Sequence, residues 1–441
     1  MVSEAVVAID RLAYGGSGFG RIEGKACFVP FSAPGDVVRV RLCRETASYA
    51  QAEIIRLLES SPLRISPPCP LFGSCGGCHW QHLGYPAQVA AKEEIFADSL
   101  WRLARVERDR LLPPLTAREP WGYRSRIQLK LCGRGEEFRI GFFAPGSHRV
   151  VDLAGGCPVA HPLLNRALAV LRPVVEEFPQ RDSLQQIDLA AGDDGTVVMT
   201  VHYSGDDPRR VEEFWRTRQQ RLAPITGATL RRGGRGKLSA IFGEQRLTYE
   251  LPAPSPDGAA GSLRLAFSTG SFSQVNYGQN RELVSTALEW GNPTGGERVL
   301  DLCCGNGNFS LPFARSAGEV IGLETGELSV ADARRNAATC AIEHTRFEVQ
   351  DGAAGVRRFI AAGERFDLVI MDPPRSGAAE MAVLLGDLGA EKILYISCDP
   401  QTLGRDLAHL QKGGYRVVKS RVVDMFPQTY HMESITLLER L

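Results

Sequence analysis

The chain has 441 residues, with 51 Lys and Arg against 51 Asp and Glu, and 44% of its residues are hydrophobic. This composition is typical of a folded globular protein and excludes a disordered or fibrous one. The length predicts about two to four domains, each with a core of its own. The sequence contains neither an apolar run long enough for a membrane span nor a secretion signal, so we expect a cytoplasmic protein without a membrane partner.

Residues 1–60 combine short runs of alternating apolar and polar residues with two turn sequences. The runs are AVVAIDRLA, GRIEGKACFVPF, DVVRVRLCRE and YAQAEIIRLL, and the turns are GGSGFG and APGD. Alternation with a period of two predicts strands that bury one face. The first domain is therefore expected to be a small antiparallel β-barrel.

Residues 61–266 have a mixed pattern that begins with the Pro-rich sequence SPLRISPPCP. Prolines at this density mark a boundary between elements, and a helical stretch follows at about 86–106. Strand-like runs such as RSRIQLKL and TVVMTVHY then mix with helical stretches near 161–178 and 208–222. This pattern predicts an α+β middle domain.

Residues 267–441 alternate strand-like runs (VLDLCC, EVIGLE, FDLVIMD, ILYISC) with helical ones, and two more strand-like runs close the chain. Alternation of this kind is typical of a doubly wound, Rossmann-like parallel sheet. Ligands bind such sheets at the carboxyl ends of the strands, so polar residues at these ends are candidate site residues.

The first strand end carries the glycine-rich sequence DLCCGNGN at 301–308. It lacks the third glycine of a dinucleotide fingerprint and a basic residue for a pyrophosphate, which argues against NAD and against a P-loop. Glu324 ends the next strand, Asp351 follows the third and Asp372 ends the fourth. These carboxylates favour a cationic cofactor without phosphate, namely S-adenosylmethionine. For each acid taken alone, a helix cap or a loop carboxylate is the competing interpretation.

Two further residues are candidates for catalysis. Cys398 directly follows the strand-like YIS, and Asp399-Pro400 predicts a capped helix whose N-terminal end would lower the thiol pKa. Glu433 precedes an apolar strand on a segment that can fold back over the same edge. Taken alone, the cysteine would be assigned to packing and the glutamate to the surface.

Four of the eleven cysteines have the spacing of a metal site. Cys69, Cys75 and Cys78 lie together in a Gly- and Pro-rich segment, and Cys157 is followed by proline. Four thiolates can hold either zinc or an iron–sulfur cluster, whereas the odd total argues against a disulfide framework. The cysteines in apolar runs are assigned to packing: Cys27, Cys43, Cys132, Cys304 and Cys340.

Five motifs, SFSQVN, DLCCGNGNFSLP, MDPPRSG, SCDPQTL and MFPQTYHMES, resemble the signatures of the RNA uracil-C5 methyltransferase family. The resemblance covers the whole chain. The N-terminal segment resembles the TRAM RNA-binding domain, and CPLFGSCGGCHWQHLGYPAQ resembles the iron–sulfur segment of the branch that acts on 23S ribosomal RNA. Relatives that act on transfer RNA usually have neither segment.

This resemblance implies a class I S-adenosylmethionine-dependent enzyme that methylates C5 of a single-stranded or loop uridine in RNA, with 23S rRNA as the expected substrate. It makes Cys398 the nucleophile that adds to C6 and Glu433 the base that removes the C5 proton. It makes Cys69, Cys75, Cys78 and Cys157 ligands of a 4Fe-4S cluster. Six positions would bind the donor: Gln274, Cys303, Asn308, Glu324, Asp351 and Asp372. Cys303 departs from the family pattern, because relatives usually carry an aromatic residue there.

Three other interpretations remain open. The chain can be a tRNA uridine-C5 methyltransferase, or a non-catalytic RNA-binding iron–sulfur protein with a degenerate methyltransferase domain. Radical methyl transfer is disfavoured by the cysteine spacing and by a separate nucleoside pocket. No obligate protein partner is implied. Between residues 100 and 130, eight Lys and Arg stand against three acids. Charges such as Arg124 and Arg126 can therefore contact RNA, although solvated helix faces and loops are the more common interpretation of such a run.

Overall fold

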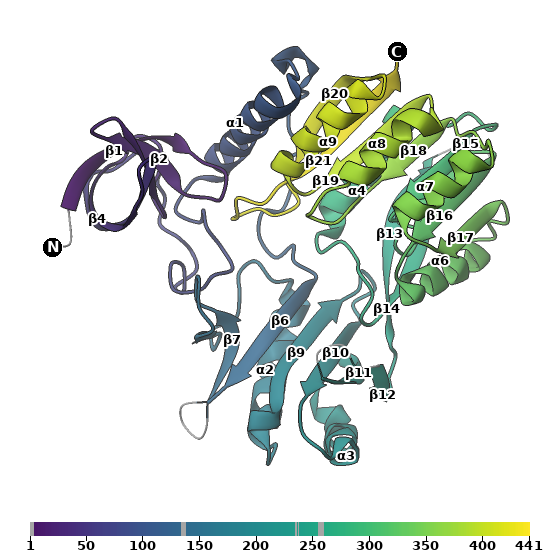
Figure 1. Cartoon of the computed structure of the whole chain (residues 1–441). Helices are drawn as coiled ribbons and strands as arrows, with labels where there is room; N and C mark the ends of the chain where they lie inside the picture. Colours follow the sequence, from purple (N-terminus) through teal and green to yellow (C-terminus); the bar gives the residue numbers. More distant parts are fainter. Residues whose placement is uncertain (1–3, 134–137, 234–235, 237, 255–259) are drawn as a thin grey trace.

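The computed structural model of the chain describes residues 4–133, 138–233, 236, 238–254 and 260–441. Figure 1 shows an N-terminal barrel, a second sheet below it and a C-terminal sheet covered by helices. Among the described residues, no helix has both the length and the apolar character that a membrane crossing requires.

The N-terminal barrel is closed, as the alternating sequence predicts. Its core contains fully buried side chains such as Val7, Val29 and Val38 together with Cys27. Pairing of β3 with β5 is parallel, so the expectation of a wholly antiparallel barrel is wrong at this one seam. The reason is that β5 lies between β3 and β4 in the closed order β1-β2-β3-β5-β4. Its strands are β1 (Glu4–Leu12), β2 (Gly18–Ile22), β3 (Lys25–Val29), β4 (Val37–Glu45) and β5 (Tyr49–Glu59).

The cysteine-containing segment leads from the barrel into α1 (Tyr85–Ala104), which starts with Pro86 in its first turn. Helix α1 lies between the barrel and the C-terminal helices in Figure 1. Its Phe96 and Leu100 belong to the same hydrophobic core as Leu300 and Leu403 of the C-terminal region. The segment after the barrel is thus packed onto the region that carries the methyltransferase-like motifs.

The middle region is a seven-stranded, largely antiparallel sheet in the order β12-β11-β10-β9-β6-β7-β8. Two helices share its hydrophobic core, α2 (Pro162–Glu176) through residues such as Leu171 and α3 (Pro208–Arg218) through Trp215. The strands are β6 (Arg126–Cys132), β7 (Arg139–Phe143), β8 (Val150–Asp152), β9 (Leu184–Ala191), β10 (Val197–Tyr203), β11 (Ile225–Arg232) and β12 (Leu238–Gly243).

A two-stranded hairpin, β13 (Arg246–Pro254) with β14 (Ala260–Ser268), connects the middle region to the C-terminal one. Its side chains Tyr249 and Phe267 pack in one core with Val284 and Val299 of the C-terminal region. The hairpin therefore extends the packing of the C-terminal sheet.

The C-terminal sheet has the order β17-β16-β15-β18-β19-β21-β20. The first five strands in this order are parallel, and β21 joins antiparallel to β19 and to β20. The strands are β15 (Arg298–Leu302), β16 (Glu319–Glu324), β17 (Thr345–Val349), β18 (Leu368–Met371), β19 (Lys392–Ser397), β20 (Tyr415–Val423) and β21 (Glu433–Arg440). This architecture confirms the predicted multidomain fold with a Rossmann-like C-terminal domain.

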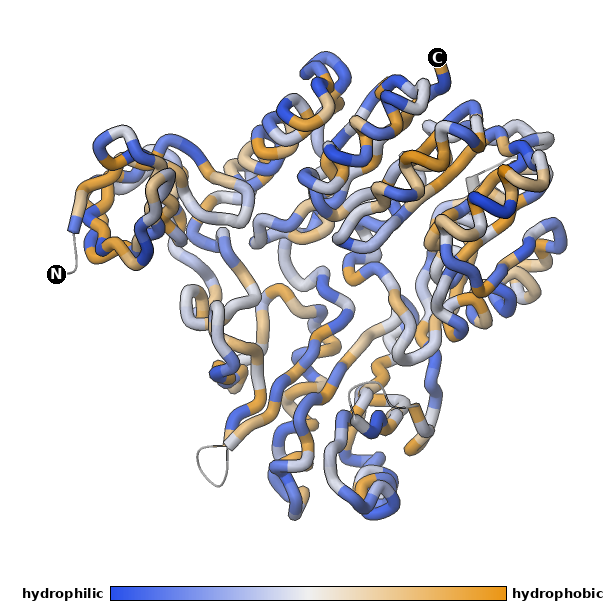
Figure 2. The backbone as a smooth tube through the Cα atoms, in the orientation of Figure 1, coloured by the Kyte–Doolittle hydropathy of each residue, from blue (hydrophilic) through white to orange (hydrophobic). Residues whose placement is uncertain are grey.

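The helices around this sheet are amphipathic. In α9 the buried residues Leu403, Leu407 and Leu410 recur at helical spacing. Figure 2 shows hydrophobic and hydrophilic stretches alternating along these helices. They are α4 (Tyr277–Gly291), α5 (Ser310–Ala314), α6 (Glu327–Thr339), α7 (Gly352–Ala361), α8 (Ala379–Leu388) and α9 (Pro400–Lys412).

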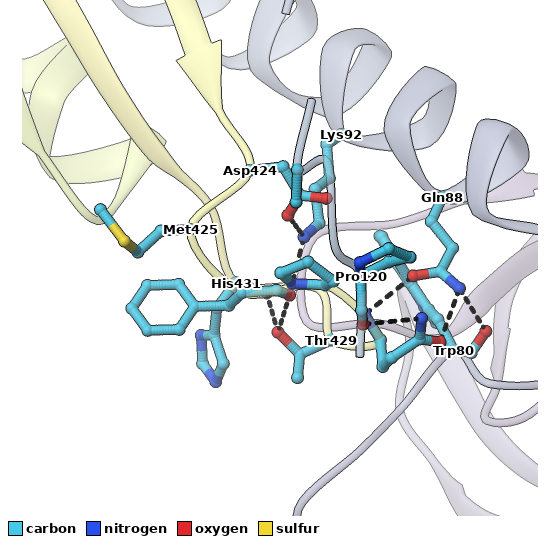
Figure 3. Close-up of polar contacts among 12 residues, drawn as sticks. Trp80, Gln88, Lys92, Pro120, Asp424, Met425, Thr429 and His431 are labelled. Carbon is cyan, nitrogen blue, oxygen red and sulfur yellow. Dashed lines mark hydrogen bonds and ion pairs between the residues drawn. The ribbon is translucent and has the colours of Figure 1, made fainter. Parts of the chain in front are cut away.

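A buried ion pair joins α1 to the loop at 424–432 that precedes β21 (Figure 3). The Lys92 ammonium lies 2.5 Å from the Asp424 carboxylate, and both side chains are almost completely buried. Gln88, one turn earlier, donates to the Gln428 side chain at 2.9 Å and accepts from the Gln428 backbone N–H at 2.9 Å. Helix α1 therefore holds the loop that leads to Glu433.

We predict that Lys92→Ala lowers the free energy of unfolding by about 3–5 kcal/mol in urea titrations, because Asp424 is left charged and buried without its partner. The double variant Lys92→Met/Asp424→Leu is expected to recover most of this loss. Arg108→Ala is the control, since its ion pair with Glu94 is exposed and contributes little. A single variant as stable as the unmodified protein would show that the pair does not hold the loop.

Candidate active site

The register of β19 with β21 brings the two predicted catalytic residues together. Ser397 pairs with Ser434, and the Ser434 hydroxyl donates to the Ser397 carbonyl at 3.1 Å. Cys398 directly follows Ser397 and Glu433 directly precedes Ser434, so the two residues adjoin this pair, and the charge of Glu433 acts on the Cys398 thiol. Two residues separated by a long stretch of chain thus meet at the carboxyl edge of the parallel strands.

The surroundings of Cys398 raise the pKa of its thiol to about 12, first because the thiol is buried and then because Glu433 and Asp372 lie near it. Asp399 does cap α9, accepting from the backbone N–H groups of Gln401 and Thr402. The expectation that the helix end lowers this pKa is nevertheless wrong. Desolvation and neighbouring acids outweigh the helix end.

Glu433 is 3% exposed, and its pKa lies well above the usual range because of burial and the charge of Asp372. Arg375 opposes this shift only in part. A carboxyl group with a raised pKa is a stronger base than an exposed one, which suits the removal of a proton from carbon.

The turn after β15 has a backbone that approaches the neighbouring strand end closely. Cys303, Gly305 and Gly307 all have positive φ angles, of 65°, 55° and 92°. The Gly305 N–H donates to the Glu324 carboxylate at 3.3 Å, and Gly326 donates to the same side chain at 2.8 Å. Glu324 is therefore placed beside the turn, as its position at the end of β16 predicts.

Acidic groups gather beneath this turn. Asp301 is fully buried with a pKa raised to about 7, and its Oδ1 has no hydrogen-bond partner among the described residues. The pKa of Asp372 is also raised to about 7, by burial and by the charge of Glu324. Burial and the charges of Asp372 and Glu324 raise the pKa of Cys303 to about 12. These acids destabilise one another's charges, so a bound cation would be stabilised here.

Asn308 and Gln274 occupy the side of the site formed by β13 and α4. The Asn308 side chain bonds Asn280 at 2.8 Å and the Tyr249 hydroxyl at 3.2 Å. Gln274 is 7% exposed and lies two residues before Asn276, which caps α4 and donates to the Met425 carbonyl. The sequence interpretation missed Asn280 and Tyr249, for which the only signal is a polar residue inside an apolar segment.

Asp351 acts as a helix cap, which is the alternative to donor binding that the sequence leaves open for each of these acids. It is exposed and caps α7 by accepting from the Ala354 N–H at 2.9 Å. Its position after β17 still places it at the same edge of the sheet.

The four predicted ligand cysteines line one cavity of about 670 Å³, together with Gly76, Gly77 and Arg124. Burial, followed by the charges of the other three cysteines, raises the pKa of Cys78 to about 12 despite a hydrogen bond from Gln81. Within the described part of the chain, no group of three or more His, Cys, Asp or Glu side chains is arranged to hold a metal ion. The four thiols therefore share one cavity, but the described side chains are not arranged as a metal site.

The basic run between residues 100 and 130 does not form a continuous cationic patch. Arg126 lies 3.6 Å from Asp188, Arg118 lies 3.2 Å from Glu282, and Arg108 pairs with Glu94. Arg124 lines the cysteine cavity and donates to the Arg126 carbonyl. Much of the positive charge is therefore compensated by neighbouring acids.

Comparison with protein families finds two matches. The model described as tRNA (Uracil-5-)-methyltransferase matches residues 86–441. The model described as tRNA (uracil(54)-C(5))-methyltransferase, TRAM domain, matches residues 6–63. The second model is named for a transfer RNA enzyme, so a TRAM domain also occurs in a relative that acts on tRNA, and the segment alone does not decide between the two RNA substrates.

Curated relatives match the chain over nearly its full length. The 23S rRNA (uracil(1939)-C(5))-methyltransferase RlmD of Methylococcus capsulatus is 35% identical, covering 98% of this chain and 96% of its own. The protein of the same name from Thiobacillus denitrificans is 37% identical, covering 99% of each.

A solved structure is similar throughout. The tRNA (uracil-54, C5)-methyltransferase of Pyrococcus abyssi, in complex with S-adenosyl-L-homocysteine, is 26% identical with a TM-score of 0.74. The match covers 98% of this chain and 99% of that one.

The thiol environment predicts that Cys398 reacts slowly with iodoacetamide in the free protein, with an apparent midpoint well above the ordinary thiol value of 9.0. Only the thiolate is nucleophilic, so the rate rises with pH. Asp372→Asn removes a negative neighbour and is expected to lower the midpoint. Peptide mass spectrometry measures the rate, with the exposed Cys43 as internal control. Faster alkylation of Cys398 than of Cys43 at pH 7 would contradict the raised pKa.

Proposed function

This chain belongs to the tRNA (uracil-5-)-methyltransferase family, and on this premise we propose that it methylates C5 of a uridine in 23S ribosomal RNA with S-adenosylmethionine as donor. The observation that carries the proposal is that Cys398 and Glu433 directly adjoin the paired Ser397 and Ser434, at the edge where the family motifs meet, and that the charge of Glu433 acts on the thiol. Relatives at 35–37% identity are named for this reaction, and their names support 23S rRNA as the substrate.

Cys398 solves the main chemical difficulty, because C5 of uracil is a poor carbon nucleophile. Its thiolate forms a bond to C6, and the electron pair of the C5–C6 double bond moves toward C5 and O4. C5 then takes the methyl group, and the donor leaves as S-adenosylhomocysteine. Glu433 removes the C5 proton, the sulfur–C6 bond breaks, and the products are 5-methyluridine and the regenerated thiolate. Because such an enzyme acts on a base outside the helical stack, we propose a single-stranded or loop uridine.

The raised thiol pKa makes ionisation of Cys398 part of the reaction. Asp372 and Glu433 disfavour the thiolate in the free protein, and Asp372 is a nearby base that can accept the thiol proton, which leaves the Glu433 carboxylate to remove the C5 proton. S-adenosylmethionine, when bound, supplies the methyl group and a positive sulfonium charge. A cation among Asp301, Glu324 and Asp372 offsets the charges that oppose ionisation, so we propose that donor binding favours the reactive thiolate.

The residues of this site suit that donor. Asp301 has a buried carboxylate oxygen without a partner among the described residues, and the charges of Asp372, Glu324, Asp301 and Asp351 act on Cys303 in the turn. We propose that Glu324 binds the ribose hydroxyls and that the backbone at Cys303 lies against the nucleoside. The remaining proposed donor-binding positions are Gln274, Asn308, Asp351 and Asp372.

We propose that Cys69, Cys75, Cys78 and Cys157 hold a 4Fe-4S cluster. In support, the four thiols line one cavity, and Gly76 and Gly77 leave room around it. Methyl transfer by the covalent route moves no net electrons, so the proposed role is structural. Free thiols throughout the described chain suit a reducing cytoplasm.

Transfer RNA is the second candidate substrate. The solved structure that is similar throughout, and the TRAM family model, both come from enzymes named for uridine 54 of tRNA. The higher identity to the enzymes named for 23S rRNA favours the ribosomal substrate.

The proposed reaction predicts different defects for the two catalytic residues. With unmodified 23S rRNA transcript and labelled donor, Cys398→Ala is expected to abolish both methyl transfer and any protein–RNA adduct. Glu433→Gln permits addition and methyl transfer but stalls elimination, so a methylated adduct that survives denaturing electrophoresis is expected to accumulate.

Unmodified tRNA serves as the competing RNA in the same assay. Methylation of tRNA alone would replace the proposed substrate and leave the mechanism intact. Adduct formation by Cys398→Ala, or normal turnover by Glu433→Gln, would contradict the assigned roles.

The proposed cluster predicts a brown protein with about four irons per chain when it is purified without oxygen. Cys75→Ser is expected to lower the iron content strongly, whereas Cys132→Ser, at an exposed position in β6, is expected to retain it. Metal analysis that finds one zinc and no acid-labile sulfide would overturn the cluster.

A further inference from the structure

Aromatic rings from three separate segments meet beside the candidate active site. Tyr14 comes from the β1–β2 loop of the barrel, His79 from the cysteine segment, and Tyr430 and His431 from the loop before Glu433. Ring centroids are 6.1 Å apart for Tyr14–Tyr430, 4.7 Å for His79–Tyr430 and 4.2 Å for Tyr430–His431. We call these four residues the aromatic platform.

The platform remains accessible to a ligand. Tyr14 is 43% exposed, and His79, Tyr430 and His431 are half-buried. None of the four side chains is therefore fully enclosed in a core.

The platform borders the catalytic residues. The Tyr14 hydroxyl donates to the carboxylate of Asp399, the residue that follows Cys398. His431 lies two residues before Glu433. The exposed Arg375 acts electrostatically on Tyr14, Cys398 and His431, which places all three around one cationic side chain. A nucleotide next to a uridine held at Cys398 would therefore reach the platform.

Burial, and then the positive charge of Arg375, lowers the pKa of His431 to about 4, so this imidazole is uncharged at neutral pH. The platform thus offers aromatic rings for stacking, with Arg375 and Arg124 nearby for phosphate, and this combination is typical of single-stranded nucleic acid sites.

Hydrogen bonds tie the three segments together. The backbone N–H groups of His79 and Trp80 donate to the Gln428 carbonyl at 2.9 and 3.1 Å. The Trp80 indole donates to the Gly16 carbonyl at 2.8 Å, two residues after Tyr14. Figure 3 shows Trp80, Gln88 and His431 in this region. The platform is therefore ordered before any ligand binds, which reduces the entropy lost on binding.

We propose that the aromatic platform of Tyr14, His79, Tyr430 and His431 stacks the nucleobases that flank the target uridine. This proposal rests on the proposed function, because the proposed reaction places the target uridine at Cys398. Stacking on ring faces tolerates any base, so the platform would position RNA without reading its sequence.

A fluorescent RNA trapped in register tests this directly. The probe is a single-stranded RNA that carries 5-fluorouridine at the target position and 2-aminopurine on one side of it, with a second RNA labelled on the other side. With S-adenosylmethionine present, C5 of the 5-fluorouridine adduct takes the methyl group, and the adduct then cannot resolve, since fluorine does not leave as a cation. Stacking quenches 2-aminopurine, so at least one of the two adducts of the unmodified protein is expected to be quenched.

Tyr430→Ala and His79→Ala are expected to restore the fluorescence of that adduct, whereas Tyr430→Phe keeps the ring and is expected to retain the quench. The same alanine variants are expected to bind the RNA roughly 5- to 100-fold more weakly, with an unchanged salt dependence and unchanged affinity for S-adenosylhomocysteine. Trp101→Ala removes another exposed ring, 44% exposed on the last turn of α1, and serves as the control.

The possible failures are distinguishable. If the unmodified protein forms no adduct, the proposed covalent function is overturned, and the affinity ratios alone judge the platform. If the adducts form but neither is quenched, or if Tyr430→Ala and His79→Ala bind RNA as tightly as Trp101→Ala, the platform does not stack bases.

Discussion

The antiparallel pairing of β21 with β19 is the constraint on which the chemistry of this protein depends. A purely parallel sheet would bring only carboxyl ends of strands to the ligand edge, whereas the reversed β21 brings its first residue, Glu433, to the same edge. Side chains alternate along a strand, so a slip of one residue in this register would turn Glu433 to the opposite face. The strand residues next to the thiol and the carboxylate are thus joined by backbone hydrogen bonds between β19 and β21, most of whose residues are buried, and this pairing is a rigid support for the two groups that we propose act in sequence.

The N-terminal half of the chain supports the same edge from outside. The loop at 424–432 has no regular structure, and its order depends on Lys92 and Gln88 of α1, on the backbone at His79 and on the barrel loop that contains Tyr14. The proposed cluster lies in the segment immediately before His79. Loss of the cluster would therefore disturb the RNA-facing side of the active site before it disturbed the donor pocket, which is formed by the turn after β15 and by Glu324.

Residue order along the chain was sufficient to predict much of this organisation. Strand ends in a doubly wound sheet converge, so Glu324, Asp372, Cys398 and Glu433 were candidates from their positions, and the family motifs added the roles proposed for them. Contacts between distant segments were not predictable: Lys92 and Asp424 are 332 residues apart, and Tyr14 and Asp399 are 385 apart. The thiol pKa was predicted in the wrong direction because a helix end is visible in sequence, whereas burial and the approach of Glu433 and Asp372 are properties of the folded chain. The parallel seam of the barrel was missed because alternation does not specify which strands pair.

The central claim is that Cys398 activates C5 and that Glu433 removes its proton, and release of tritium from RNA labelled at C5 of uridine measures that proton directly. The account predicts that the unmodified enzyme releases one tritium for each methyl group transferred, that Cys398→Ala releases none, and that Glu433→Gln transfers methyl groups while its tritium remains on the adduct. Tritium release by Glu433→Gln at the rate of the unmodified enzyme, or any release by Cys398→Ala, would contradict it.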